Sequence, residues 1–266
     1  MFDTARLTDT ATRPSGGRSP AADPIQAPGT RESRWAAWPT LAGLPRYPLE
    51  AVTSALVLAA HPDDETLGIG GTLAMLAAAG VRLRIVVATD GEGSHPHSNA
   101  VTPVQLARRR RQEDLDSLSR LGIDEREVIR LGLPDSSLAD YEGELTEIVD
   151  RMAEGFSLCL APWSGDLHPD HEAVGRAAAR GARAAGVPVC HYPVWMWHWA
   201  SPADHRVPWR RAARIDLDAR TMAAKNEAVA CHRSQVLPLG PLAADAPILP
   251  AEDLAHFQRP YEVVFT

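Results

Sequence analysis

Histidines and acidic residues gather at two places in the chain, and each place follows a short apolar run. The first cluster is His61, Asp63 and Asp64, within "LVLAAHPDDETLGIGG" at residues 56–71. The second is "GDLHPDHE" at residues 165–172. Zinc accepts histidine nitrogen and carboxylate oxygen, and catalytic zinc sites combine three protein ligands with an open position for water. The two clusters together therefore indicate hydrolysis at a bound metal ion.

Spacing within each cluster supports this chemistry. His168 and His171 are three positions apart, so the first turn of a helix places both on one face. Asp63 and Asp64 are adjacent, so their side chains diverge in most backbone conformations. One carboxylate can then bind the metal while the other takes a proton from the attacking water. The spacing alone leaves open which aspartate does which.

Each piece of this pattern also has a purely structural interpretation. A lone His-Pro at a strand end is usually a turn, and adjacent carboxylates are commonly a solvated turn. "HPDH" can simply begin a helix, where the dipole favours an aspartate. However, both clusters fall at the carboxyl ends of separate predicted strands. That coincidence favours one shared metal site.

Apolar runs and helix-stop residues predict the elements that must position these clusters. Short buried strands are predicted at 54–60, 82–90, 127–133, 157–163, 187–195 and 212–218, with an edge strand at 261–266. Helices are predicted at 70–80, 101–122, 143–155, 168–186 and 219–235, with Thr102 as an N-cap, Pro103 at the first helical position and Gly80 and Gly122 as stops. Such alternation predicts right-handed βαβ units and a mostly parallel sheet with helices on both faces. Ligands bind at the carboxyl ends of the strands in such sheets.

Length and composition set the broad class of the protein. The 266 residues, 45% of them hydrophobic, can build one large α/β domain with a sizeable core. A formal net charge of −7 argues against nucleic acid or an anionic membrane as the main partner. No run approaches the roughly 20 apolar residues that a membrane span needs. We expect an N-terminal extension at 1–50 and one α/β domain at 51–266.

The N-terminal extension and the cysteines bear on location. Residues 1–34 lack the apolar run of a secretory signal, and their Pro, Ser, Thr and Gly content predicts a partly flexible tail. The three cysteines, Cys159, Cys190 and Cys231, are far apart and form no CxxC pair. This pattern favours free thiols, and therefore a cytoplasmic location.

As a pair, "AHPDDE" (60–65) and "HPDH" (168–171) resemble the PIG-L, or LmbE-like, zinc-dependent N-deacetylase superfamily. Weaker matches follow in "RRQEDLDSLSRLG" (110–122), "LGLPDSSL" (131–138) and "KNEAVACHRSQ" (225–235). The resemblance covers about residues 52–236. It implies a Rossmann-like α/β fold and hydrolysis of the acetamide of an amino sugar. The implied cofactor is Zn²⁺, although two histidines and one aspartate would also suit Fe²⁺.

The same resemblance implies residue roles by motif position. It assigns three metal ligands, which are His61, Asp64 and His171. Asp63 would be the general base, and His168 would polarise the acetamide carbonyl or stabilise the oxyanion. Asp170 would orient one of the histidines. Arg110 resembles a substrate-binding arginine of the family, although the run of arginines from 108 to 111 also fits a solvated helix face.

Two further regions are candidates for substrate contact. Asp90 ends the predicted strand 82–90 and would face the same rim as the two clusters. Trp197 and His198 lie in "VWMWHWASPADHRVPW" (194–209), where an extended segment would place alternate indoles on one face. Such a face can stack on a sugar ring. A buried lid hinge, or the interface of a homo-oligomer, would use tryptophans equally well.

Other functions fit the sequence less well. Gly68 and Gly70 follow a strand as in a dinucleotide-binding turn, but position 73, where a third glycine is needed, is Leu73. We expect these glycines to let a helix pack close to the sheet. A receiver-type signalling module would not explain "HPDH". The expected substrate is a small-molecule amino-sugar conjugate of the N-acetylglucosamine type. An amidase for a thiol conjugate or a longer acyl chain, and an inactive metal-binding relic, remain as alternatives.

Overall fold

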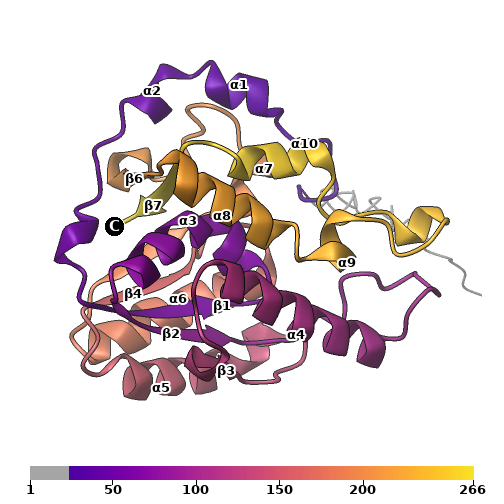
Figure 1. Ribbon diagram of the computed structural model, residues 1–266, viewed down its shortest axis with the longest axis horizontal. Helices are drawn as coiled ribbons and strands as arrows, with labels where there is room; N and C mark the ends of the chain where they lie inside the picture. The colour runs from indigo at the N-terminus through magenta and orange to yellow at the C-terminus, as the bar shows by residue number, and fades with distance from the viewer. Residues whose placement is uncertain (1–23) are drawn as a thin grey trace, which may run out of the picture.

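A seven-stranded sheet forms the centre of the computed structural model, which describes residues 24–266 (Figure 1). The strands are β1 Ser54–Ala59, β2 Arg82–Val87, β3 Val128–Arg130, β4 Leu158–Pro162, β5 Val189–Tyr192, β6 Ala212–Asp216 and β7 Tyr261–Phe265. Their order across the sheet is β3-β2-β1-β4-β5-β7-β6. β1 to β5 pair in parallel, and β7 is antiparallel to both of its neighbours. The predicted mostly parallel sheet is confirmed.

The last strand is not where the sequence predicted it. The segment 261–266 was expected at an edge, but β7 lies between β5 and β6, so that β6 is the outer strand. Val263, Val264 and Phe265 are all buried. Consecutive buried apolar residues are typical of a strand covered on both faces, which is the property of an interior strand.

Helices cover both faces of the sheet, as predicted. The long helices are α3 Asp64–Ala78, α4 Pro103–Arg120, α5 Glu142–Ala153, α6 Pro169–Ala184 and α8 Ala219–Val229. Residues of α5 and α6 build one apolar core on one face, while α3 and α4 contribute to a separate core on the other. Figure 1 shows α3 and α8 on the side of the sheet opposite α5. The short helices are α1 Glu32–Ala36, α2 Pro39–Ala42, α7 Met196–Trp199, α9 Arg233–Val236 and α10 Ala251–Leu254.

Local signals at the helix ends explain where α3 and α4 begin and stop. Thr102 and Gln105 form a capping box at the start of α4, and Pro103 is its first residue. Gly122 and Gly80, just past α4 and α3, have φ of 82° and 69°. Glycine adopts this left-handed conformation at little steric cost, so both predicted stops are confirmed.

The predicted helix 219–235 is broken in the structure. α8 ends at Val229 and α9 begins at Arg233. Ser234 donates to Glu113 of α4 from its backbone N–H at 2.9 Å and from its hydroxyl at 2.6 Å. This buried anchor on another helix stabilises the turn, and such a long-range contact leaves no signal in the local periodicity.

α3 begins earlier than the predicted 70–80 and packs tightly on the sheet. A Cβ added at Gly68 would lie 2.3 Å from the ring of Tyr192 in β5. The expectation that the glycines allow close packing is therefore confirmed. The helix is kinked at Ile69, where φ is −141° and ψ is 21°. The kink interrupts the backbone hydrogen bonds of the helix.

A glutamate of β7 satisfies the backbone after this kink. Glu262 accepts hydrogen bonds from the N–H groups of Gly71 (2.7 Å) and Thr72 (2.8 Å). Lys225 of α8 donates its Nζ to the same carboxylate at 2.6 Å, and both side chains of the pair are buried. A buried carboxylate without a countercharge is costly, so the chain's single lysine fixes α3 between β7 and α8.

The segment before β1 also contacts the core. Trp35 of α1 is fully buried and packs edge-on against Trp197, with ring centroids 5.2 Å apart. The domain boundary near residue 50 stays a prediction. The flexible tail was predicted for 1–34, and most of it, residues 1–23, lies outside the described residues. Within 24–266, none of the helices has the length and apolar content needed to cross a bilayer.

We predict that Lys225→Ala lowers the free energy of unfolding by about 3 to 5 kcal/mol, because it leaves the buried Glu262 carboxylate unpaired. Urea denaturation followed by circular dichroism measures this loss. Glu227→Gln is the control on the same helix, since its ion pair with Arg120 spans 3.7 Å with both side chains more than half exposed. The control should lose no more than about 1 kcal/mol. Equal losses in the two variants would contradict the role of the buried pair.

Candidate metal centre

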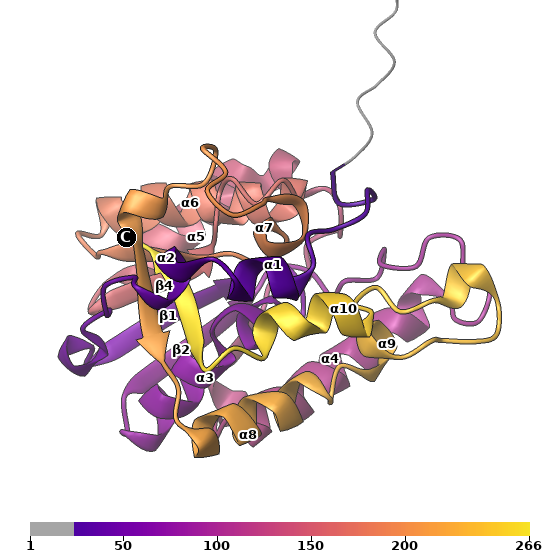
Figure 2. The same ribbon diagram turned by 90° about the horizontal axis from the view of Figure 1, so that it is seen from above.

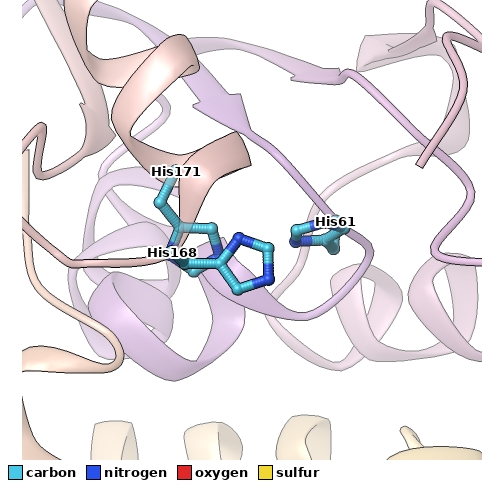
Figure 3. Close-up of side chains that lie close together, drawn as sticks. All are labelled: His61, His168 and His171. Carbon is cyan, nitrogen blue, oxygen red and sulfur yellow. The ribbon is translucent and has the colours of Figure 1, made fainter. Parts of the chain in front are cut away.

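The two His/Asp clusters meet because β1 and β4 are neighbours in the sheet. His61 follows β1, and His168 is the N-cap residue of α6, which follows β4. Figure 3 shows the rings of His61, His168 and His171 close together, the first from the loop after β1 and the last from the start of α6. One ring nitrogen from each lies within 4.8 Å of the others. These three nitrogen atoms are therefore close enough together to be candidate ligands of a single metal ion.

The predicted ligand set also includes Asp64, which touches both other members. Its Oδ1 lies 3.1 Å from His171 Nε2, and its Oδ2 lies 3.6 Å from His61 Nδ1. The same Oδ2 accepts hydrogen bonds from the N–H groups of Ala60 and His61, which holds the carboxylate in place. The structure thus brings the three predicted ligands together. Their role as ligands stays a prediction.

Further carboxylates lie behind the histidines and orient them. Asp166 Oδ2 is 2.7 Å from His171 Nδ1, while Asp170 Oδ2 and Asp135 Oδ1 are 3.2 Å and 3.1 Å from His61 Nε2. Metal-binding histidines usually give their second ring nitrogen to a carboxylate in this way. Asp170 was predicted as such a partner. Asp135 and Asp166 were missed, although both lie inside motifs that the sequence analysis quoted.

Among the described residues, three buried ring nitrogens lack a hydrogen-bond partner, and two of them belong to this site. These two are His171 Nε2, beside Asp64, and His168 Nδ1. A buried polar atom normally has a partner, so such atoms require an explanation. Imidazole nitrogen and carboxylate oxygen are the donors that Zn²⁺ and Fe²⁺ accept in proteins. The residues present therefore fit a metal ion of this kind.

Burial and neighbouring charges shift the pKa values of Asp63, His168 and His171 in different directions. Burial raises the pKa of Asp63 to about 7, and the Arg110 guanidinium partly offsets this effect. Burial lowers the pKa of His168 to about 2, and the charges of His171 and His61 lower it further. For His171 burial acts downward, but Asp64 and Asp166 outweigh it and raise its pKa to about 9. A cation that binds His171 must therefore displace a proton.

Asp63 has an unusual backbone conformation. Its φ is 134° and its ψ is −25°, a region that side-chain-bearing residues rarely adopt. Such strain concentrates at functional sites, where the surrounding structure enforces it. Arg110 is part of that enforcement, since its Nη2 donates to Asp63 Oδ2 at 3.1 Å and to the Pro62 carbonyl at 2.9 Å. The carboxylate of Asp63 is thus held at the wall of a cavity.

Arg110 differs from the other arginines of its run. It is 4% exposed, whereas Arg108, Arg109 and Arg111 are exposed on the surface of α4. Its Nη1 donates to the carbonyl of Gly91, where a Cβ would lie 2.0 Å from the guanidinium. The solvated-face interpretation therefore does not apply to Arg110. Its predicted contact with substrate stays a prediction, since its contacts in the structure are to the chain itself.

The cavity above the histidines has a volume of about 790 Å³. Its floor is formed by His61, Asp64, Arg110, Asp135, His168 and His171, with Asp63 at the adjoining wall. His198, predicted as a substrate contact, also lines it. Asp90 does not, because it forms an ion pair with Arg111 and lies at a separate surface hollow. The lining of the cavity therefore does not support the expected contact of Asp90 with substrate.

The tryptophan segment is also corrected. Residues 196–199 form the short helix α7 and are not extended, so the alternate indoles do not share a face. Trp197 is 4% exposed and packs among Trp35 and Trp209, away from the residues that line the cavity. Trp195 lines the cavity in its place. The buried structural role for Trp197 is the one that the packing supports.

Two other groups of potential metal donors occur among the described residues: one shares His61 with Asp135 and Asp170, and the other lies away from His61. Glu65, Asp114 and His232 are buried with donor atoms within 4.8 Å of one another. Arg130 donates to Asp114 at 2.5 Å, so this group already contains a positive charge. Burial also raises the pKa of both carboxyl groups, which favours a proton between them. This group is therefore less suited to a dication than the site at His61.

Comparison with known proteins adds a family and a set of relatives. Residues 56–182 match the family model described as PIG-L, GlcNAc-PI de-N-acetylase. A diacetylchitobiose deacetylase of Thermococcus kodakarensis is 28% identical over 145 residues, which is 53% of each chain. A 1D-myo-inositol 2-acetamido-2-deoxy-alpha-D-glucopyranoside deacetylase of Catenulispora acidiphila is 30% identical over 158 residues, covering 50% of this chain and 52% of the relative. The chain thus spans about half the length of these relatives.

Among solved structures, the N,N'-diacetylchitobiose deacetylase of Pyrococcus horikoshii superimposes with a TM-score of 0.56 at 22% identity. The superposition covers 80% of this chain and 82% of that one. At this identity the likeness establishes the fold, which is the mostly parallel α/β architecture described above. The family match and the curated relatives together show that residues 56–182 of this chain are similar to the PIG-L, or LmbE-like, N-deacetylase superfamily.

Proposed function

We propose that the protein is a metal-dependent N-deacetylase acting on an N-acetylglucosamine-type conjugate. The observation that carries this proposal is the meeting of His61, Asp64 and His171 at the floor of a cavity whose wall also holds Asp63. The names of the curated relatives support the reaction class, since each describes the removal of an acetyl group from an amino sugar. The products would be acetate and a free amine.

A Zn²⁺ or Fe²⁺ ion at His61, Asp64 and His171 would supply Lewis acidity and lower the pKa of water. Asp63 is placed to take a proton from that water at its carboxylate, because it lines the cavity beside Asp64 and His171. Arg110 holds the carboxylate in its strained position through the contact with Oδ2. The same carboxyl group can then return the proton to the departing nitrogen.

His168 has a different proposed role, which is to stabilise the negative charge on the acetamide oxygen. Burial keeps its ring neutral, and the ring lines the cavity beside His171. A neutral imidazole can donate one N–H to the carbonyl oxygen of the acetamide as negative charge develops there. The carboxylates of Asp166 and Asp135 keep the neighbouring histidines oriented.

We further propose a reducing, cytoplasmic location, since Cys159, Cys190 and Cys231 are all free thiols.

We predict that Asp63→Asn lowers kcat for amine release from N-acetylglucosamine by about 100- to 10,000-fold, because the amide cannot accept the proton. Metal content, measured by mass spectrometry, should be unchanged. Asp90→Asn is the matched control and should keep the kcat of the unaltered protein, since Asp90 lies outside the cavity. Full turnover in metal-loaded Asp63→Asn would refute the assignment of the base.

Metal removal gives a second prediction. Chelation should abolish amine release, and addition of Zn²⁺ or Fe²⁺ should restore it, the better activator being the working metal. Asp135→Asn should weaken metal affinity by about 10- to 100-fold, because His61 loses the carboxylate that orients it. Competition with a fluorescent chelator measures this change. Undiminished activity in rigorously metal-free protein would exclude the proposed mechanism.

A further inference from the structure

The outer wall of the cavity is built from segments that lie outside the family match at 56–182. Residues 25–29, 194–198 and 247–253 contribute most of this wall. Figure 1 and Figure 2 together show that α1, α7 and α10, which contain or adjoin these segments, lie close together. The residues of the cavity floor thus fall within the family match, whereas these three segments, which make up about half of the lining residues, lie outside it.

One histidine ties these segments to each other. His198 Nδ1 is 2.8 Å from Asp253 Oδ1, and His198 Nε2 is 2.8 Å from the carbonyl oxygen of Ala27. The backbone carbonyl of His198 also accepts from the N–H of Thr30 at 2.8 Å. A Cβ at Gly29 would lie 2.4 Å from the ring. The wall is therefore closely packed around His198.

The chemistry of the wall differs from that of the floor. Its lining includes Pro28, Trp195, Pro247, Ile248, Leu249 and Pro250. Its carboxylates are Glu252 and Asp253. Among the described lining residues, Arg110 is the only lysine or arginine, and its guanidinium already binds Asp63 and two carbonyls. Recognition of a phosphate or carboxylate normally uses an arginine or lysine that can reach it. The wall offers none.

The volume indicates that this wall contacts a substantial part of the substrate. At about 790 Å³ the cavity lies in the upper range of sites that enclose drug-sized ligands. One acetamido sugar over the histidines would occupy only part of it. The group attached to the sugar would then lie against the proline-rich wall and the indole of Trp195.

We propose that residues 25–29, 194–198 and 247–253 form a binding site for an uncharged, apolar aglycone of the N-acetylated amino sugar, and that they disfavour phosphorylated or carboxylated conjugates. This inference rests on the proposed deacetylase function and adds the substrate class. Burial of the aglycone's apolar surface against these segments favours its binding. The carboxylate of Glu252 repels an anionic aglycone, whereas that of Asp253 is already paired with His198.

The test compares three substrates of the metal-loaded full chain: N-acetylglucosamine, its hexyl glycoside and N-acetylglucosamine 1-phosphate. The hexyl glycoside should exceed the 1-phosphate in kcat/KM by about tenfold or more, as expected for one apolar contact set. Equal values, or a preference for the 1-phosphate, would overturn the inference.

Variants locate the effect on the wall. Ile248→Asn should lower the ratio of kcat/KM for the hexyl glycoside to kcat/KM for N-acetylglucosamine by about tenfold. Leu242→Asn is the matched control, because Leu242 is 61% exposed and lies outside the cavity lining. Glu252 is exposed. Glu252→Lys should lower the ratio of kcat/KM for the hexyl glycoside to kcat/KM for the 1-phosphate by about fivefold, because the lysine attracts the phosphate. An unchanged substrate ratio in both wall variants would place the selectivity elsewhere.

A binding measurement separates this inference from the proposed function. Calorimetry on the metal-loaded protein would compare hexyl glucosaminide with glucosamine 1-phosphate. Tighter binding of the hexyl compound supports the aglycone site even if no substrate of the panel is hydrolysed, in which case the proposed function alone fails. Equal or tighter binding of the 1-phosphate contradicts the aglycone site whatever the activity.

Discussion

The pairing of β1 with β4 is the constraint on which the site depends. The chain builds β1, β2 and β3 outward in one direction and then returns to place β4 on the other side of β1. Open α/β sheets bind ligands at such a reversal, where the loops after the two strands diverge and leave a crevice. Here the loops carry His61 and His168, so the topology alone brings residues more than 100 positions apart into contact.

Helix α3 positions the proposed base, Asp63, and the proposed metal ligand Asp64. Its first residue is Asp64, and its N-cap residue Asp63 has the strained backbone. Its middle is fixed by the buried contact of Glu262 with Lys225, and Gly68 lets it approach Tyr192 closely. Charges buried at its start are balanced by Arg110 and by the histidines. Tight packing of an otherwise regular helix thus maintains two carboxylates in positions that an isolated turn would not hold.

Local sequence was enough to predict the strand–helix alternation, the caps of α4 and the approach of His61 to His171, because each leaves a local signal: apolar runs, a Thr-Pro start, and motifs at strand ends. It was not enough for Asp135, since this residue follows the edge strand β3 and reaches His61 only through the folded loop. It also misplaced Trp197, because a four-residue helix has no period to detect and its partner Trp35 is far away in the sequence. The interior position of β7 likewise depends on sheet order, which local periodicity does not encode.

Anomalous diffraction at the zinc edge from crystals of stoichiometrically loaded protein tests the central claim most directly. The account predicts one strong peak within about 2.0 to 2.2 Å of a nitrogen of His61, a nitrogen of His171 and an oxygen of Asp64. A peak at Glu65, Asp114 and His232, or one that leaves Asp64 uncoordinated, would contradict the account.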